Sequence, residues 1–166
     1  MATFKKQKIV NATQEEVWST LSNYGDIYKF NPGVKKSYIT SDKNQGIGAT
    51  WICELLPVGK VSETIKEWDE NHGFLLKVAP LEKLPPIEKF TTHFKIEKLS
   101  VNTSRVSVTV NYSMKLGVTG KILNKILIQP KLEGSIEDLL SGLKAHIEKD
   151  VLITDTKSLK DILKSV

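Results

Sequence analysis

The first two thirds of the chain alternate between apolar and polar residues, and the last third repeats apolar residues at helical spacing. Alternation with a period of two predicts strands, and it is clearest at residues 89–99 and 105–116. Four further strands are expected at residues 34–40, 48–56, 60–68 and 74–78. No segment between these strands has the length or period of a crossover helix, so they should form an antiparallel meander.

The segment before this meander predicts an edge strand and two short helices. Residues 4–10 are rich in lysine, which is typical of a strand at a sheet edge. Residues 13–16 (Thr-Gln-Glu-Glu) have the form of a capping box, and the helix they begin should end near Gly25. Residues 26–30 are expected to add a second short helical turn.

From Gly120 to Ile147, apolar residues recur at helical spacing and predict one long helix. Pro130 must kink this helix or break it in two. The small residues Gly134 and Gly142, with Ser135, would allow close approach to the sheet or leave room for a ligand. We therefore expect an α+β fold in which a curved antiparallel sheet of about seven strands wraps around the long helix.

The whole chain, residues 1–166, is expected to form one domain, with residues 155–166 as a C-terminal extension. Its apolar content of 40% and charged content of 26% are typical of a soluble globular protein. We find no signal peptide and no apolar run long enough to span a bilayer, so we expect a cytoplasmic protein.

The net charge of +5 comes almost entirely from lysine, because Arg105 is the only arginine. Lysine is a hydrated point charge rather than a rigid fork, so we interpret the basic surface as a source of solubility and not of specific nucleic-acid recognition. Cys53 is alone and is expected to be a small buried hydrophobe. The three histidines have no metal-ligand spacing, so neither a metal nor a cofactor is expected.

Five short motifs follow one another along the chain. Residues 10–18 read VNATQEEVW, residues 30–34 read FNPGV, and residues 45–50 read QGIGAT. Residues 63–69 read ETIKEWD and residues 143–148 read LKAHIE. In this order they resemble the START-like polyketide cyclase/dehydrase (SRPBCC) superfamily, with its "I-x-A-P-x-E-x-V-W" opening, "W-x-P-x-V", "G-x-G" hairpin, "E-x-(I/L)-x-x-x-D" strand and "L-K-x-x-(I/V)-E" helix.

The resemblance implies the helix-grip fold, with a deep and mostly apolar cavity between the sheet and the C-terminal helix. Thr13 stands where the family usually has proline, and Phe30 where it has tryptophan. The superfamily includes lipid and sterol carriers, plant hormone receptors, coenzyme Q-binding proteins, aromatic cyclases and chaperone co-factors. The resemblance therefore implies a container and not one activity.

Alternation within each strand predicts which residues line this cavity. On the sheet we expect Trp51, Cys53, Leu55, Val61, Glu63, Ile65, Phe74, Leu76, Phe90, Thr92, Phe94, Val108, Val110, Tyr112 and Met114. On the long helix we expect Leu123, Leu127, Ile136, Leu139, Leu140 and Leu143. For residues 34–40 two inward sets remain open, Lys35/Ser37/Ile39 or Val34/Lys36/Tyr38, because a slip of one residue exchanges them.

Glu63 is the one charged residue on an otherwise apolar inward face. A buried carboxylate must be paired, protonated or hydrated, and Lys35, Tyr112 and Thr92 are the expected partners. Glu63 is either a polar anchor for a ligand headgroup or part of a structural ion pair that reaches solvent. In the hormone-receptor branch of the superfamily a glutamate at this place lies in the polar ligand network, so the resemblance favours the anchor.

Residues 55–59 and 80–86 are expected at one end of the sheet, around the cavity mouth, either as a gate or as simple strand ends. We expect the protein to bind or carry a hydrophobic small molecule such as a lipid, quinone, isoprenoid or polyketide. One alternative is a cyclase, dehydratase or hydrolase with Glu63, Tyr112 or Lys35 as acid–base groups. Another is a basic adaptor for a protein, ribosome or membrane surface.

Overall fold

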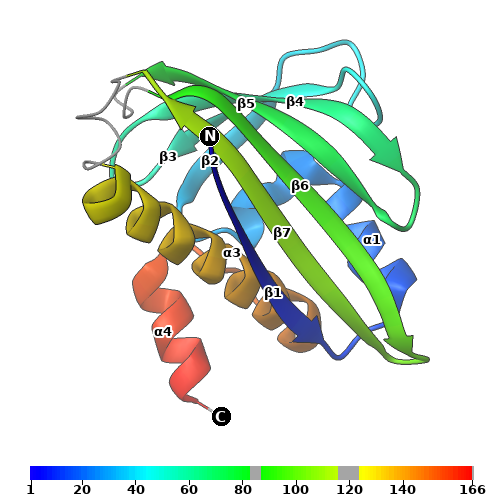
Figure 1. The fold of residues 1–166 in the computed structure, drawn as a ribbon. Helices are drawn as coiled ribbons and strands as arrows, with labels where there is room; N and C mark the ends of the chain where they lie inside the picture. The colour runs from blue at the N-terminus through cyan, green and yellow to red at the C-terminus, as the bar shows by residue number, and fades with distance from the viewer. Residues whose placement is uncertain (83–86, 116–123, 166) are drawn as a thin grey trace.

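Seven strands form one antiparallel sheet in the computed structural model, which describes residues 1–82, 87–115 and 124–165. The strands are β1 (Ala2–Val10), β2 (Val34–Ile39), β3 (Thr50–Leu55), β4 (Lys60–Asp69), β5 (Gly73–Glu82), β6 (Ile87–Ser100) and β7 (Thr103–Met114). Strands β2 to β7 are neighbours in chain order, and β1 lies at the far edge beside β7 (Figure 1). The predicted meander, with a lysine-rich edge strand, is confirmed.

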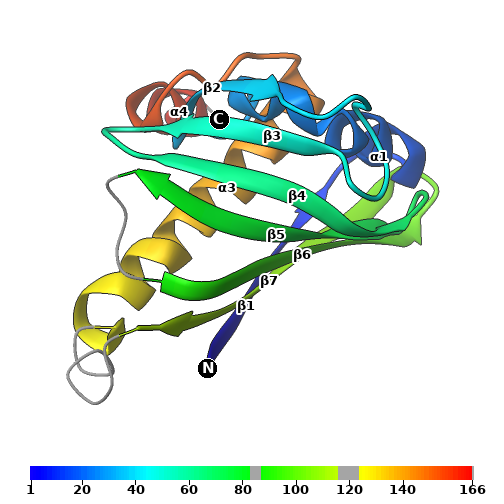
Figure 2. The same cartoon turned by 90° about the horizontal axis from the view of Figure 1, so that it is seen from above.

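Two short helices follow β1, and the long helix lies across the concave side of the sheet (Figure 2). The short helices are α1 (Gln14–Ser22) and η1 (Tyr24–Lys29), and α1 begins with the predicted capping box of Thr13 and Glu16. The later helices are η2 (Asn124–Ile128), α3 (Gln129–Lys149) and α4 (Thr156–Lys164). The predicted α+β helix-grip fold is confirmed.

Pro130 lies where the helical segment divides into η2 and α3, which confirms the predicted break. The five residues before α3 form the π-helical turn η2, and Pro130 occupies the first turn of α3. Proline is tolerated in the first turn of an α-helix because its fixed φ suits the helix.

Strand β5 continues through Pro80, where the sequence pattern predicts a loop. Pairing between β5 and β6 ends at Lys77 and Thr91, whereas β4 pairs with β5 as far as Glu82. Beyond Lys77 the strand therefore has a neighbour on one side only, and Pro80 occupies an edge-like position where proline is allowed. Lys60 lies opposite Glu82, so the β3–β4 turn and the end of β5 meet at one end of the sheet, as predicted. Residues 83–86 of that predicted loop lie outside the described residues.

Strand β2 follows neither of the two predicted alternations. Its register against β3 shifts between Val34 and Lys36, so that Val34 is buried opposite Leu55 and Ser37 then lies opposite Cys53. The shift leaves Lys35 on the exposed side, and the predicted inward position of Lys35 is wrong. A bulge adds one residue to a strand, and a reading based on strict alternation cannot locate it.

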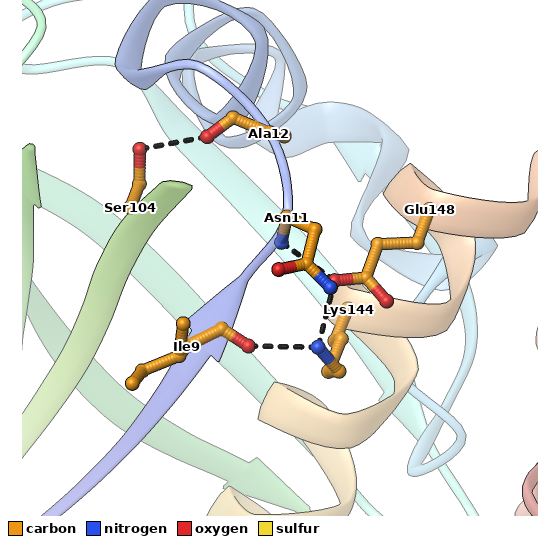
Figure 3. Close-up of polar contacts among 6 residues, drawn as sticks. All are labelled: Ile9, Asn11, Ala12, Ser104, Lys144 and Glu148. Carbon is orange, nitrogen blue, oxygen red and sulfur yellow. Dashed lines mark hydrogen bonds and ion pairs between the residues drawn. The ribbon is translucent and has the colours of Figure 1, made fainter. Parts of the chain in front are cut away.

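Helix α3 is attached to the edge strand β1 by a series of polar contacts (Figure 3). The Nζ of Lys144 donates to the carbonyl of Ile9 at 2.9 Å and pairs with Glu148 at 2.7 Å. The same Glu148 carboxylate accepts the backbone N–H of Asn11 at 2.6 Å. Two ion pairs extend the attachment towards the start of the helix, Lys8–Glu137 at 2.9 Å and Lys6–Glu133 at 3.0 Å.

The second attachment of α3 is a close backbone approach at Gly142. A Cβ at this position would lie 2.0 Å from the carbonyl oxygen of Phe30, so the helix contacts the chain after η1 and not the sheet. At Gly134 no heavy atom lies within 4 Å of the corresponding position, so this glycine is not needed for packing.

These two glycines make a matched test of the contact. Gly142→Ala should lower the free energy of unfolding by about 3 kcal/mol, because the new methyl group collides with backbone that cannot turn aside. Gly134→Ala should raise the free energy by up to about 1 kcal/mol, because alanine is the better helix former. Urea unfolding of both variants measures this, and equal effects at the two positions would contradict the role given to Gly142.

Candidate functional site

A polar cluster lies inside the sheet, beneath η1. Glu63 on β4 lies opposite Trp51 on β3, and both side chains face the concave side. The thiol of Cys53 donates to Oε2 of Glu63 at 3.3 Å. The hydroxyl of Tyr24, from η1, also hydrogen-bonds the Glu63 carboxyl. The carboxyl is thus held by two neutral donors.

Burial decides the ionisation of this cluster. Desolvation raises the pKa of Glu63, and the hydrogen bonds from Cys53 and Tyr24 only partly oppose that rise. Burial, with Glu63 nearby, also raises the pKa of the Cys53 thiol and of Tyr24 far above their usual ranges. The cluster therefore favours the neutral form of all three groups, and Cys53 is not an activated nucleophile.

The partners that the structure shows for Glu63, Cys53 and Tyr24, are not among the predicted ones. Lys35 is exposed on the other side of β2, and Tyr112 belongs to β7, which is separated from β4 by β5 and β6. Tyr24 was missed because it was assigned to the end of a helix, although it continues the apolar spacing of Val17 and Leu21. That spacing indicates that Tyr24 is buried. Only the position of η1 over the sheet brings Tyr24 to Glu63.

Aromatic side chains fill the space around this cluster. The Tyr24 ring lies edge-on to Trp51, Phe74 and Phe94, with centroids 5.7, 5.5 and 5.9 Å away. Phe74 and Phe94 stack at 4.9 Å. This half of the concave face is a packed core and not an empty container.

Most of the predicted lining residues belong to that core. The buried members are Trp51, Cys53, Val61, Ile65, Phe74, Leu76, Thr92, Phe94, Val108, Val110, Tyr112, Leu139, Leu140 and Leu143. They share the concave side as predicted, and they mainly pack against one another.

The other half of the concave face is less well covered, and we call it the open half. Its side chains pack against the core but keep part of their surface exposed; they are Leu55, Phe90 and Met114 on the sheet and Ile128, Leu132 and Ile136 on η2 and α3. All three strand residues lie near the end of the sheet where β3 and β7 finish and β6 begins. Glu63 also faces the concave side, and part of the residue is exposed. Part of the apolar surface of the sheet and of the helix is thus left uncovered.

One predicted helix residue, Leu127, does not belong to this surface. Leu127 is 59% exposed in η2, so its predicted inward position is wrong. A π-helical turn has more residues per turn than an α-helix, which shifts the apolar stripe before Pro130. Leu123 lies outside the described residues.

A surface groove of about 430 Å³ lies beside the β2–β3 edge. Its walls come from the segment before β2, the β3–β4 turn, α3 and the start of α4; the lining residues are Pro32, Gly33, Leu56, Pro57, Ser135, Asp138, Asp155, Thr156 and Lys157. Within the described ranges, no group of three or more histidine, cysteine, aspartate or glutamate side chains could hold a metal ion. In the same part of the chain, no helix is both long and apolar enough to cross a membrane.

The family model described as "Polyketide cyclase / dehydrase and lipid transport" matches residues 1–148. The chain belongs to this family, which confirms the resemblance of the five motifs. The match ends within α3, so α4 lies beyond it. A search of curated proteins found no match.

Solved structures agree on the fold. A START superfamily protein from Mycobacterium smegmatis is 17% identical, with a TM-score of 0.72 over 90% of this chain and 99% of that one. The Zhui aromatase/cyclase from Streptomyces is 10% identical, with a TM-score of 0.68 over 90% and 97%. The di-domain ARO/CYC protein BexL is 14% identical, with a TM-score of 0.73 over 89% of this chain and 47% of BexL. At these identities the similarity shows the fold alone.

The raised pKa of Glu63 predicts a pH dependence of stability. The folded state holds this proton to a higher pH than the unfolded state, so the stability it contributes is complete below the ordinary value of 4.5 and is lost as pH rises through the folded-state pKa. Within a measured range of about pH 5 to pH 8, the free energy of unfolding should therefore fall as pH rises towards the folded-state pKa, by at most about 1.4 kcal/mol per pH unit. Glu63→Gln should remove this slope, as measured by urea unfolding across the range.

Glu133 provides the control, because its shift has the opposite sign. Hydrogen bonds from Gln129 and Lys6 lower the pKa of Glu133, so the stability it contributes is present above its ordinary value and is lost in acid. Glu133→Gln should leave the slope between about pH 5 and pH 8 unchanged. A wild-type slope that survives Glu63→Gln would show that another group titrates.

Proposed function

We propose that this protein binds a hydrophobic small molecule, such as a lipid, quinone, isoprenoid or polyketide-like compound, between the sheet and the first half of α3. The observation that carries the proposal is the open half, where apolar side chains of sheet and helix remain partly exposed. Covering apolar surface is favourable by about 25 cal/mol per Å², so an apolar ligand would gain affinity from this surface.

The composition of the site supports an apolar ligand. Leu55, Phe90 and Met114 on the sheet and Leu132 and Ile136 on α3 all pack against the same core, and the Glu63 carboxyl, favoured in its neutral form, is a polar group on the concave face. Predominantly apolar walls with few polar groups are typical of small-molecule sites. The family description names both cyclisation chemistry and lipid transport, and both require an apolar molecule to be held. The free, buried Cys53 agrees with the reducing cytoplasm, where we propose that the protein acts.

Ligand binding can be tested by filling the proposed space. Met114→Trp and Leu132→Trp should weaken binding of a fluorescent apolar probe, 1-anilinonaphthalene-8-sulfonate, and of library compounds found by native mass spectrometry, by about tenfold. Thr109→Trp places the same side chain on the outer face of β7 and should bind as the wild type does. Unchanged binding in both filling variants would contradict this location of the site.

A second candidate function is acid–base catalysis on the bound molecule, as in a polyketide cyclase or dehydratase. The observation that favours it is the Glu63 carboxyl on the apolar face, because desolvation raises its pKa, which is the direction that favours a proton donor. Lys35 is not part of this candidate site, because its side chain is exposed.

Turnover separates the two functions. If Glu63 donates a proton to substrate, Glu63→Gln should lower kcat by about a hundredfold or more while the ligand still binds, as followed by mass spectrometry of ligand products. Tyr112→Phe tests the other predicted acid–base group in the same assay. Turnover that neither substitution changes would argue against catalysis by these residues.

A further inference from the structure

Five exposed apolar side chains surround the end of the sheet at which the open half lies. Leu56 and Val58 are in the β3–β4 turn, Leu81 is near the end of β5, and Ile126 and Leu127 are in η2; their exposed fractions run from 39% to 65%. Figures 1 and 2 both place the end of β5 and the start of α3 on the same side of the molecule, and Lys60 opposite Glu82 ties the β3–β4 turn to the end of β5. We call these five residues the apolar rim.

The apolar rim does not resemble a surface that a folded protein partner would cover. Its members project from three separate segments and stand apart from the packed core, to which none of the five belongs. Interfaces between proteins are enriched in aromatic residues and arginine. The rim has leucine, isoleucine and valine, and the single arginine of the chain, Arg105, lies towards the opposite end of β7.

Lysines accompany the rim. Lys125 precedes Ile126 directly, Lys131 follows one turn later, and Lys115 stands at the end of β7; all three are exposed. Lys60 at the start of β4 pairs with Glu82 at 3.6 Å. An anionic bilayer has an apolar interior and a negatively charged surface of headgroups. The rim side chains match the interior, and the flexible lysines beside them match the headgroups.

We propose that the apolar rim docks this protein on anionic membranes, with the open half facing the bilayer. In this position the rim side chains enter the boundary between headgroups and acyl chains, and the lysines remain at the level of the phosphates. A hydrophobic ligand would then pass between the bilayer and the open half without crossing water. The transfer of a ligand rests on the proposed function, whereas the docking itself requires no ligand.

Vesicle co-sedimentation of the full chain tests the docking. The protein should sediment with phosphatidylcholine vesicles that contain about 30% phosphatidylserine, and binding should weaken at least tenfold with pure phosphatidylcholine or in about 0.5 M salt. Val58→Asp and Leu127→Asp should each reduce binding about tenfold, because a charge is placed where an apolar side chain enters the bilayer. Lys125→Glu should reduce binding only to the anionic vesicles.

The chain offers a matched control at the other end of the sheet. Val101, in the β6–β7 turn, is 74% exposed and equally apolar, so Val101→Asp should bind vesicles as the wild type does. Equal losses in Val58→Asp and Val101→Asp, or no sedimentation of the wild type, would overturn the proposal. A concentration-dependent dimer that the rim variants abolish, without vesicle binding, would assign the rim to a second copy and also overturn it.

The outcome is separable from that of the proposed function. Probe binding in solution uses the Met114→Trp and Leu132→Trp variants, which leave the rim intact, and these variants should still sediment with anionic vesicles. Normal docking with no binding of any apolar compound would remove the proposed function and leave the membrane surface standing. Binding of an apolar compound without sedimentation on vesicles would leave the proposed function standing and remove the membrane surface.

Discussion

The close attachment of the second half of α3 is the constraint on which the rest of this structure depends. Gly142 brings the helix against the backbone of Phe30, and Lys144 and Glu148 bind it to the end of β1. These contacts all belong to the second half of the helix. They hold that half close to the core, whereas the first half reaches over the sheet, pairs with Lys6 and Lys8 and keeps Leu132 and Ile136 partly exposed. A rigid helix fixed in this way covers the concave face unevenly.

The uneven covering divides the interior into two parts with different chemistry. Under η1 the rings of Trp51 and Phe74 pack on Tyr24, which hydrogen-bonds Glu63, and a carboxyl held by neutral donors in such surroundings favours its proton. Near the first half of α3, apolar side chains of comparable size are left partly exposed. A single fold thus contains a solid core and an apolar surface available to a ligand, and the exposed rim lies at the end where that surface opens.

Much of the fold could be predicted because its signals are local. The capping box at Thr13 and the alternation of β6 and β7 depend on neighbours in the chain, and both are observed. The errors occurred where a neighbouring element overrides the local pattern. The bulge in β2 turned Lys35 outward, the π-helical turn exposed Leu127, and β5 continued through Pro80 because it has a neighbour on only one side there. The partners of Glu63 were missed for the same reason, since Tyr24 reaches it from an element distant in sequence.

By itself, the sequence determined the family, the order of the elements and the faces of most strands, because motif order and period-two alternation are written in consecutive residues. It also determined that Glu63 would be a carboxyl among apolar neighbours. Only the tertiary structure decided how much of the concave face is filled and how much is open. That division depends on where two backbones meet, at Gly142 and Phe30, and on how far a rigid helix extends from that contact, neither of which any pattern of residue types along the chain contains.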